Sequence, residues 1–459
     1  MVKFQLPRIW NYDLYFRIEP LKSFFKVFGV LSIGNETNDE HSQLNILLYH
    51  SLKVSRIKDA NNKALSFTQE EVSLKDEEKY FINHICVTLD DILKPNEQIN
   101  LYIEYEGSIN GYSHLMAYVK DNIDKEFSIL RPDSHVYPII AQPFYETIAK
   151  SYKNTFTYNI SVDVPKEYTV GCGGILKDIV QEKERNIFKY SSDLPTWRFD
   201  IGIAQYSIVE DKDMNLKIFA FPEHETNAEN VVRNEIKRAF DLYSTLFGDY
   251  ESCNYFTVIE VKESYGSQAG DNYIMMEEHG FSSDAEKLSH LYHEIGHAWN
   301  VKAKQDVQKT RFFDEAFASY FEALAIKKFY GDRSFEEKME FYRKQYIESI
   351  QRDEINFYTP ICDYGKYDLG YNSYTKGPWA LYVLNEILGD NIFNNIIRNF
   401  LKKFRYKEVD FKDFQEIVEE ISGVNLNNFF TKWIYGIDSS KFLYEGIELS
   451  YMISNAQKN

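Results

Sequence analysis

The sequence predicts an α+β protein in which an N-terminal β domain precedes a mixed α/β domain that ends in helices. Three patterns support this prediction. Apolar and polar residues alternate over residues 156–164 and stop at Pro165, as in a half-buried strand. Over residues 232–247 the apolar residues recur at helical spacing and end at Gly248. From residue 283 onward nearly every segment has the helical period.

The predicted β domain covers residues 1–208. Residues 99–105 alternate before Gly107, and residues 52–54 and 85–89 provide further short strands. Turn-forming clusters at residues 58–62 and 173–174 separate these segments. We therefore expect the strands to pair antiparallel.

The second predicted domain covers residues 209–459. Buried strands are expected at residues 255–261 and 272–277, after the helix over residues 232–247. Further helices are expected at residues 288–301, 314–330, 335–352, 375–388, 392–404 and 411–421. The candidate catalytic and metal-binding residues lie at the change from strands to helices.

Composition limits the class of partner. The chain has 459 residues, of which 44% are hydrophobic, so it can form two or three packed cores. Its 70 acidic and 52 basic residues give a net charge of −18, which repels nucleic acid and anionic lipid. No apolar run reaches the length of a membrane span. We expect neither nucleic-acid nor membrane partners.

The cysteines and the N-terminus indicate the compartment. Four scattered cysteines form no C-x-x-C pair, which argues against a disulfide framework and a thiolate zinc site: Cys86, Cys172, Cys253 and Cys362. The N-terminal residues lack the apolar region of a signal peptide. We expect a cytoplasmic protein.

Residues 293–297 read His-Glu-Ile-Gly-His, the H-E-x-x-H pattern, within a predicted helix. A spacing of four residues places His293 and His297 on one helical face, where a single Zn²⁺ can bind both imidazoles. Glu294 lies beside the first ligand, so it can accept a proton from a water that the metal activates. This pattern predicts a catalytic zinc site with Glu294 as the base.

A catalytic zinc of this kind needs a third protein ligand and an open fourth position. Glu315 opens the next predicted helix and is the candidate third ligand. Asp314 beside it is expected to orient a ligand histidine. Glu322, two turns further along, is expected to be an ordinary residue of the helix face. The sequence thus predicts one zinc ion per chain, held by His293, His297 and Glu315.

These motifs resemble the gluzincin zinc aminopeptidases of the aminopeptidase N and leukotriene hydrolase type. Residues 314–318 (DEAFA) are similar to the run that carries the family's third zinc ligand, one residue closer to the histidines than usual. Residues 374–377 (YTKG) match the family's Y-x-K-G element. Residues 195–211 and 429–436 are similar to further family segments, so the resemblance spans most of the chain.

The resemblance implies a β-sandwich-like N-terminal domain and a thermolysin-like catalytic domain. It implies that the Tyr374 hydroxyl stabilises the oxyanion that forms at the scissile carbonyl. Residues 275–278 (MMEE) correspond to the family's amine-binding run, although Ile274 replaces a glycine and Glu278 an asparagine. By this match Glu277, together with Glu278, holds the ammonium group of the substrate.

Two features differ from the long members of the family. Residues 299–302 (WNVK) resemble the related glycyl aminopeptidases. The chain stops at Asn459, so it is expected to be a short form that lacks the C-terminal helical domain of longer relatives. Another subunit could supply that cover in an assembly.

We therefore expect a zinc metallopeptidase that hydrolyses the N-terminal peptide bond of peptides with a free N-terminus. An endopeptidase or a glycyl-type aminopeptidase of the same fold is an open alternative. A catalytically silent binding scaffold is an alternative of a different class. The sequence leaves the preferred first residue, the physiological substrate and the oligomeric state open.

Overall fold

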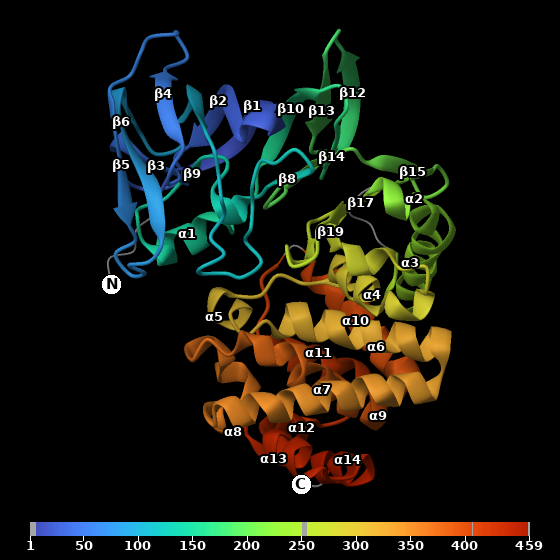
Figure 1. Ribbon diagram of the computed structural model, residues 1–459. Coiled ribbons are helices and arrows are strands. Elements are labelled where there is room, and N and C mark those ends of the chain that lie inside the picture. The colour runs from blue at the N-terminus through green and yellow to red at the C-terminus, as the bar shows by residue number, and fades with distance from the viewer. Residues whose placement is uncertain (1–5, 250–254, 406, 458–459) are drawn as a thin grey trace. The chain divides into compact units, whose positions relative to one another are not determined.

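The computed structural model describes residues 6–249, 255–405 and 407–457 (Figure 1). By its internal contacts the chain forms two compact units. The first comprises residues 1–230 and 252–282, and the second comprises residues 231–251 and 283–459. The first is rich in strands and the second in helices, which confirms the predicted α+β class.

The largest sheet of the first unit has seven strands in the order β12-β13-β10-β1-β2-β7-β4. Its strands are β1 (Arg8–Glu19), β2 (Phe24–Gly34), β4 (Lys53–Lys58), β7 (Gln98–Gly107), β10 (Thr157–Pro165), β12 (Ile175–Gln181) and β13 (Arg185–Ser191). Neighbouring strands are antiparallel, as expected, except for β1 and β10, which pair in parallel with Leu14 opposite Ile160. A parallel pair needs a long connection, and the whole set of strands between β1 and β10 provides it.

Two smaller sheets complete the N-terminal part of this unit. The first has the order β5-β6-β3-β9, and the second has the order β11-β14-β8. Their strands are β3 (His41–Tyr49), β5 (Phe67–Ser73), β6 (Phe81–Leu93), β8 (Phe127–Leu130), β9 (Ile139–Ile140), β11 (Thr169–Cys172) and β14 (Ile201–Ala204), and helix α1 (Tyr145–Ser151) follows β9. Buried residues of the three sheets belong to one hydrophobic core, as expected of a sandwich-like domain.

A five-stranded sheet, β15-β16-β17-β19-β18, also belongs to the first unit. Its strands are β15 (Ser207–Asp211), β16 (Leu216–Ala220), β17 (Phe256–Val261), β18 (Gln268–Ala269) and β19 (Tyr273–Glu277), and the short helix α2 (Glu225–Asn227) follows β16. Strands β17 and β19 are buried along their whole length, which confirms the two predicted buried strands. Whether residue 208 ends an independently folding domain stays a prediction.

The second unit consists of helices. They are α3 (Arg233–Phe247), α4 (Ser289–Gly296), α5 (Gln305–Gln308), α6 (Phe317–Tyr330), α7 (Asp332–Arg352), α8 (Ile355–Tyr358), α9 (Lys376–Leu388), α10 (Asp390–Phe404), α11 (Phe411–Ser422), α12 (Asn427–Trp433), α13 (Asp438–Glu445) and α14 (Leu449–Gln457). Helix α6 is apolar on nearly every face because α4, α7 and α9 all pack against it. It is therefore the central helix of the unit.

The predicted helices are confirmed, with two local differences at functional positions. The helix expected over residues 288–301 ends at Gly296, and His297–Trp299 continue it as a 3-10 turn. The indole of Trp299 donates to the Gly248 carbonyl at 2.9 Å, which holds this turn against the end of α3. Residues Phe312–Ala316 form a π-helical turn before α6 rather than the start of a regular α-helix.

Cys86, Cys172 and Cys362 are free thiols, whereas Cys253 lies outside the described residues. Among the described residues, every helix is too short or too polar to cross a membrane.

Candidate metal and catalytic site

The second unit brings the three predicted metal ligands together. His293 and His297 lie at the end of α4, with ring centroids 4.9 Å apart, and Glu315 lies in the π-helical turn before α6. Glu315 Oε2 is 3.1 Å from His293 Nε2 and 3.5 Å from His297 Nε2. The three ligand atoms all lie within 4.8 Å of one another. Packing of α4 against α6 produces this arrangement.

This donor set fits a tetrahedral metal ion. Zinc bonds to histidine nitrogen and carboxylate oxygen are about 2.0–2.1 Å long, so tetrahedral ligands should be roughly 3.3 Å apart. The distances from Glu315 to the two imidazoles agree with this value. Two imidazoles and one carboxylate also leave the fourth position of a catalytic site free. The residues therefore suit a catalytic zinc.

His297 is oriented by polar groups on its other side. Its Nδ1 atom is 3.0 Å from Asp314 Oδ1, as expected for a residue that orients a ligand. Arg311 pairs with both Asp314 and Glu315, and Asn300 Nδ2 donates to Asp314 Oδ1 at 2.9 Å. Burial lowers the pKa of His297, but the Glu315 and Asp314 carboxylates outweigh it and hold that pKa well above its usual value. The site thus has a strong preference for positive charge.

The arginine and the asparagine were not singled out from the sequence. Arg311 also lowers the pKa of Glu315, where His297 and Arg311 together outweigh the effect of burial. Arg311 adopts a left-handed backbone conformation, with φ of 56°, at the start of the π-helical turn. No periodicity reveals such a residue, because its role depends on the turn that it caps.

The other nitrogen of His293 faces a second polar cluster. Its Nδ1 atom is 3.5 Å from Ser319 Oγ and 3.9 Å from Glu322 Oε2. Glu322 is only 4% exposed, and it accepts from Lys338 Nζ at 2.6 Å and from the Tyr342 hydroxyl at 2.7 Å. The expectation that Glu322 is an ordinary helix-face residue is therefore wrong, because α7 covers that face of α6.

The predicted base, Glu294, is buried on α4. Its Oε1 atom is 2.9 Å from Nε2 of His290, one turn earlier on the same helix. Burial raises the pKa of Glu294. The hydrogen bond and charge of His290, together with the charges of His297 and His293, outweigh burial, so this pKa lies below its usual value. From the sequence, His290 was assigned no role. Its spacing of four from Glu294 was the sequence signal for this contact.

Tyr374 lies at the end of a 3-10 segment, Gly370–Tyr374, and its ring stacks on that of His293 at 5.8 Å. Burial and the Glu315 carboxylate raise the pKa of its hydroxyl, so this group remains a proton donor. Gly377 allows α9 to approach the π-helical turn closely, because a β-carbon at this position would lie 2.3 Å from Ala316 Cβ in that turn. The Y-x-K-G element therefore places Tyr374 beside the Glu315 turn.

Glu277 and Glu278 lie at the end of β19 in the first unit, whereas the three candidate metal ligands belong to the second. Glu277 is 9% exposed, and its Oε1 atom accepts from the Gly266 amide at 2.7 Å. Its Oε2 atom is 3.6 Å from His279 Nδ1. Glu278 instead pairs with Lys262 Nζ at 3.2 Å. The two carboxylates therefore differ in burial and in partners.

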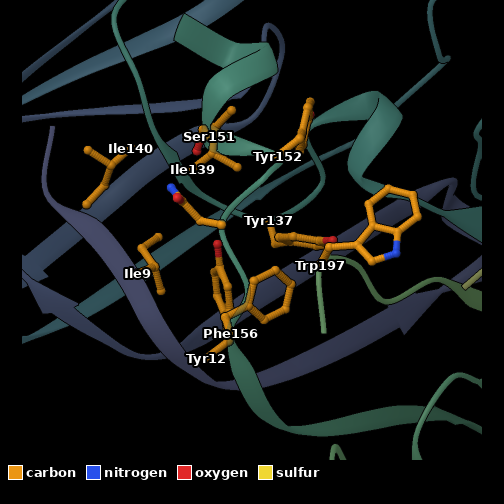
Figure 2. A pocket seen from close by; sticks show the side chains of 10 residues that line it. Ile9, Tyr12, Tyr137, Ile139, Ile140, Ser151, Tyr152, Phe156 and Trp197 are labelled. Carbon is orange, nitrogen blue, oxygen red and sulfur yellow. The ribbon is translucent and has the colours of Figure 1, made fainter. Parts of the chain in front are cut away.

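A small cavity lies elsewhere in the first unit. Aromatic side chains surround it, among them Tyr12, Tyr137, Phe156 and Trp197 (Figure 2). The Tyr12 hydroxyl donates to the Pro138 carbonyl at 2.8 Å, so its polar end is already satisfied. The side chains that line this cavity include no histidine or carboxylate, so they provide none of the metal-ligand or base chemistry described above.

Comparison with known proteins shows which proteins this chain resembles. Residues 263–433 match the Peptidase family M1 domain. Glutamyl aminopeptidase of Sus scrofa is 23% identical over 76% of the chain and 39% of its own length. Probable aminopeptidase 2 of Sulfurisphaera tokodaii is 21% identical over 73% of the chain and 44% of its own length. The chain thus spans about two fifths of these relatives.

Solved structures share the fold over nearly the whole chain. The M1 zinc metallopeptidase of Deinococcus radiodurans has a TM-score of 0.66 at 14% identity and covers 99% of this chain and 96% of its own. Yeast LTA4 hydrolase has a TM-score of 0.65 at 16% identity and covers 94% of this chain and 68% of its own. The resemblance to the gluzincin aminopeptidases is confirmed: residues 263–433 match the M1 peptidase domain, and the chain shares the fold of an M1 zinc metallopeptidase.

Proposed function

We propose that this protein is a zinc-dependent aminopeptidase that removes the first residue of peptides. The observation that carries this proposal is the convergence of His293, His297 and Glu315 beside Glu294 on α4. The M1 domain match and the aminopeptidase relatives support it. A mutant of the Deinococcus radiodurans metallopeptidase has also been solved with a Tyr-Ser-Ala substrate.

The three ligand residues would hold one Zn²⁺ per chain. When bound, zinc supplies Lewis acidity, which lowers the pKa of water and polarises the scissile carbonyl. Asp314 and Ser319 contribute by fixing the rings of His297 and His293 through their second nitrogens. Arg311 holds the Glu315 and Asp314 carboxylates in place.

Glu294 acts as general base and then as general acid. Its lowered pKa keeps the carboxylate ionised, so it can accept a proton from the attacking water. It then gives that proton to the amine that leaves when the peptide bond breaks. The His290 contact holds the carboxylate through Oε1 and leaves its other oxygen for this transfer.

Tyr374 donates a hydrogen bond to the oxyanion that develops at the scissile carbonyl. The raised pKa of its hydroxyl means that it donates without losing its proton. Stacking on His293 fixes the direction of the ring before the substrate arrives. Such a fixed donor contributes more to the transition state than to substrate binding.

Glu277 binds the ammonium group of the substrate and limits cleavage to the first peptide bond. A carboxylate makes a strong charge-assisted hydrogen bond to an ammonium group. Glu277 is buried and held by a backbone amide, whereas Glu278 is already paired with Lys262. We therefore assign the main role to Glu277 and a lesser one to Glu278.

The test compares free-amine aminoacyl amides with the same compounds N-acetylated, using wild-type protein and the Glu277→Ala and Glu278→Ala variants. We expect cleavage of free-amine substrates one residue at a time, refusal of acetylated ones, and a far larger loss from Glu277→Ala. Efficient internal cleavage of an N-blocked peptide would instead establish the endopeptidase alternative. A metal-loaded protein with no turnover on either class would establish a binding scaffold.

The same panel addresses a glycyl-type specificity, which would appear as turnover confined to glycine amides. Peptides with a free N-terminus are the proposed partners. The cytoplasmic location stays a prediction.

A further inference from the structure

A buried arginine in the first unit reaches the segment that holds Glu277. Arg131 is 0% exposed, and its guanidinium pairs with the equally buried Asp121 through Nε at 2.8 Å and Nη2 at 2.6 Å. Replacing a buried ion pair by apolar residues is often neutral or stabilising. Stability therefore gives only a weak account of this pair, and Arg131 has further donors that make other contacts.

Those donors reach two backbone carbonyls, one of them in the residue before Gly266. Nη1 donates to the Tyr265 carbonyl at 2.8 Å, and Nη2 donates to the Tyr118 carbonyl at 3.0 Å. Gly266 has φ of +79°, and a β-carbon there would lie 2.9 Å from Tyr118 Cβ. Glycine fits this position more easily than any other residue. Arg131 therefore binds the carbonyls of two segments, at Tyr265 and Tyr118, that approach each other closely at Gly266.

The Tyr265 carbonyl and the Gly266 amide belong to the same peptide group. The carbonyl accepts from Arg131, and the amide donates to Glu277 Oε1 at 2.7 Å. A cation on the carbonyl polarises the peptide group and makes its N–H a stronger donor. One peptide group thus connects the buried guanidinium to the Glu277 carboxylate.

A second contact fixes the same segment. The Gln268 side chain on β18 accepts from Arg198 Nη2 at 2.9 Å and from Arg131 Nη1 at 3.3 Å. Strand β18 pairs with β19, which ends at Glu277. The turn and the strand beside Glu277 are therefore both held by buried guanidinium groups.

We propose that Arg131 is a positioning residue for the substrate amine, acting on Glu277 through the Tyr265–Gly266 peptide group. The contact fixes Oε1 of Glu277, so the ammonium group is expected at Oε2, which also lies 3.6 Å from His279 Nδ1. This inference rests on the proposed role of Glu277. It adds that the amine site is set from the interior of the first unit.

The test is a double-mutant cycle between Arg131→Lys and Glu277→Gln, with kinetics on a free-amine alanine amide. Lysine keeps the positive charge but loses the planar fork that reaches several acceptors at once. Because the ammonium is bound equally in ground and transition states, we expect KM to rise about tenfold with kcat within about twofold. In the Glu277→Gln background, Arg131→Lys should have no further effect on KM.

The matched control is Arg185→Lys. Arg185 is also a largely buried arginine of the first unit, paired with Asp163 at 2.5 Å, and it donates to the Ile18 carbonyl at 2.8 Å. The Arg185→Lys substitution removes a comparable planar guanidinium on β13, a strand of a different sheet from the one that contains Glu277. KM should therefore stay within about twofold of wild type. A KM increase as large as that of Arg131→Lys would overturn the inference.

A second variant, Gly266→Ala, answers the question if Arg131→Lys does not fold. A β-carbon at this φ of +79° would lie 2.9 Å from Tyr118 Cβ, so the variant displaces the Tyr265–Gly266 peptide group and leaves the Arg131–Asp121 pair in place. KM should again rise, and the rise should vanish with Glu277→Gln. Additive effects on KM, or an unchanged KM, would overturn the inference. If Glu277→Gln itself leaves KM unchanged, the amine role of Glu277 fails, and this inference fails with it.

Discussion

The Nε2 atom of His293 lies 3.1 Å from the Oε2 atom of Glu315, although the two residues are 22 positions apart. The π-helical turn before α6 creates this contact by directing Glu315 toward α4. His297 Nε2 approaches the same oxygen. One carboxylate oxygen therefore faces both imidazoles, which is the arrangement that a shared metal requires.

Glu294→Gln should keep the fold and the metal while losing most turnover. Glutamine has nearly the same shape and can keep the His290 contact, but it cannot accept the proton, so kcat should fall about 10²–10⁴-fold. Kinetics on a free-amine amide with parallel metal analysis measure this. Glu286→Gln is the control, because Glu286 is exposed shortly before α4. Near-normal kcat in Glu294→Gln would exclude this base.

Tyr374→Phe should lower kcat about 10²–10³-fold with little change in KM, because the hydroxyl acts mainly on the transition state. The ring and its stacking on His293 remain. Tyr371→Phe is the control from the same 3-10 segment, since its hydroxyl donates to Asn356 Oδ1. If Tyr374→Phe changes only thermal stability, the tyrosine has a packing role instead.

Lys376 should make stability depend on pH. It is fully buried, its Nζ is 2.8 Å from Ser440 Oγ, and burial lowers its pKa from 10.5 to about 7. Between these values the unfolded chain binds the proton that the folded chain releases. The free energy of unfolding therefore rises with pH in this range, and the cost of burial is fully present below about pH 7.

The measurement is urea unfolding of wild type and Lys376→Met at pH 7.5 and pH 9.5. The unfolding free energy of wild type relative to the variant should rise by up to about 1.4 kcal/mol per pH unit. Lys344→Met on α7 is the control, because Lys344 is exposed and should show no such slope. A constant difference between wild type and Lys376→Met would show that Lys376 stays charged in the folded protein.

Local patterns predicted much of this molecule. The H-E-x-x-H spacing predicted two ligands and a base, because a spacing of four places His293 and His297 on one helical face. The strands at residues 255–261 and 272–277 and the long helices followed from periodicity. These features depend on neighbours in sequence, so one sequence suffices to find them.

Contacts between distant segments could not be predicted in this way. The parallel pairing of β1 with β10 joins residues such as Leu14 and Ile160, and no local pattern specifies it. The burial of Glu322 depends on α7 packing over α6, which the sequence around Glu322 does not reveal. The path from Arg131 to Glu277 likewise depends on the chain fold between residues 131 and 266.

Zinc content, measured with activity in wild type, Glu315→Ala and Glu322→Gln, tests the central claim most directly. We expect about one Zn²⁺ per wild-type chain, loss of activity with phenanthroline, and its return on adding zinc. Glu315→Ala should lose the metal, whereas Glu322→Gln should bind stoichiometric zinc, because a residue that only orients a ligand changes affinity by about 10–100-fold. A Glu315→Ala protein that keeps its zinc, or a Glu322→Gln protein that cannot be loaded, would contradict the ligand assignment.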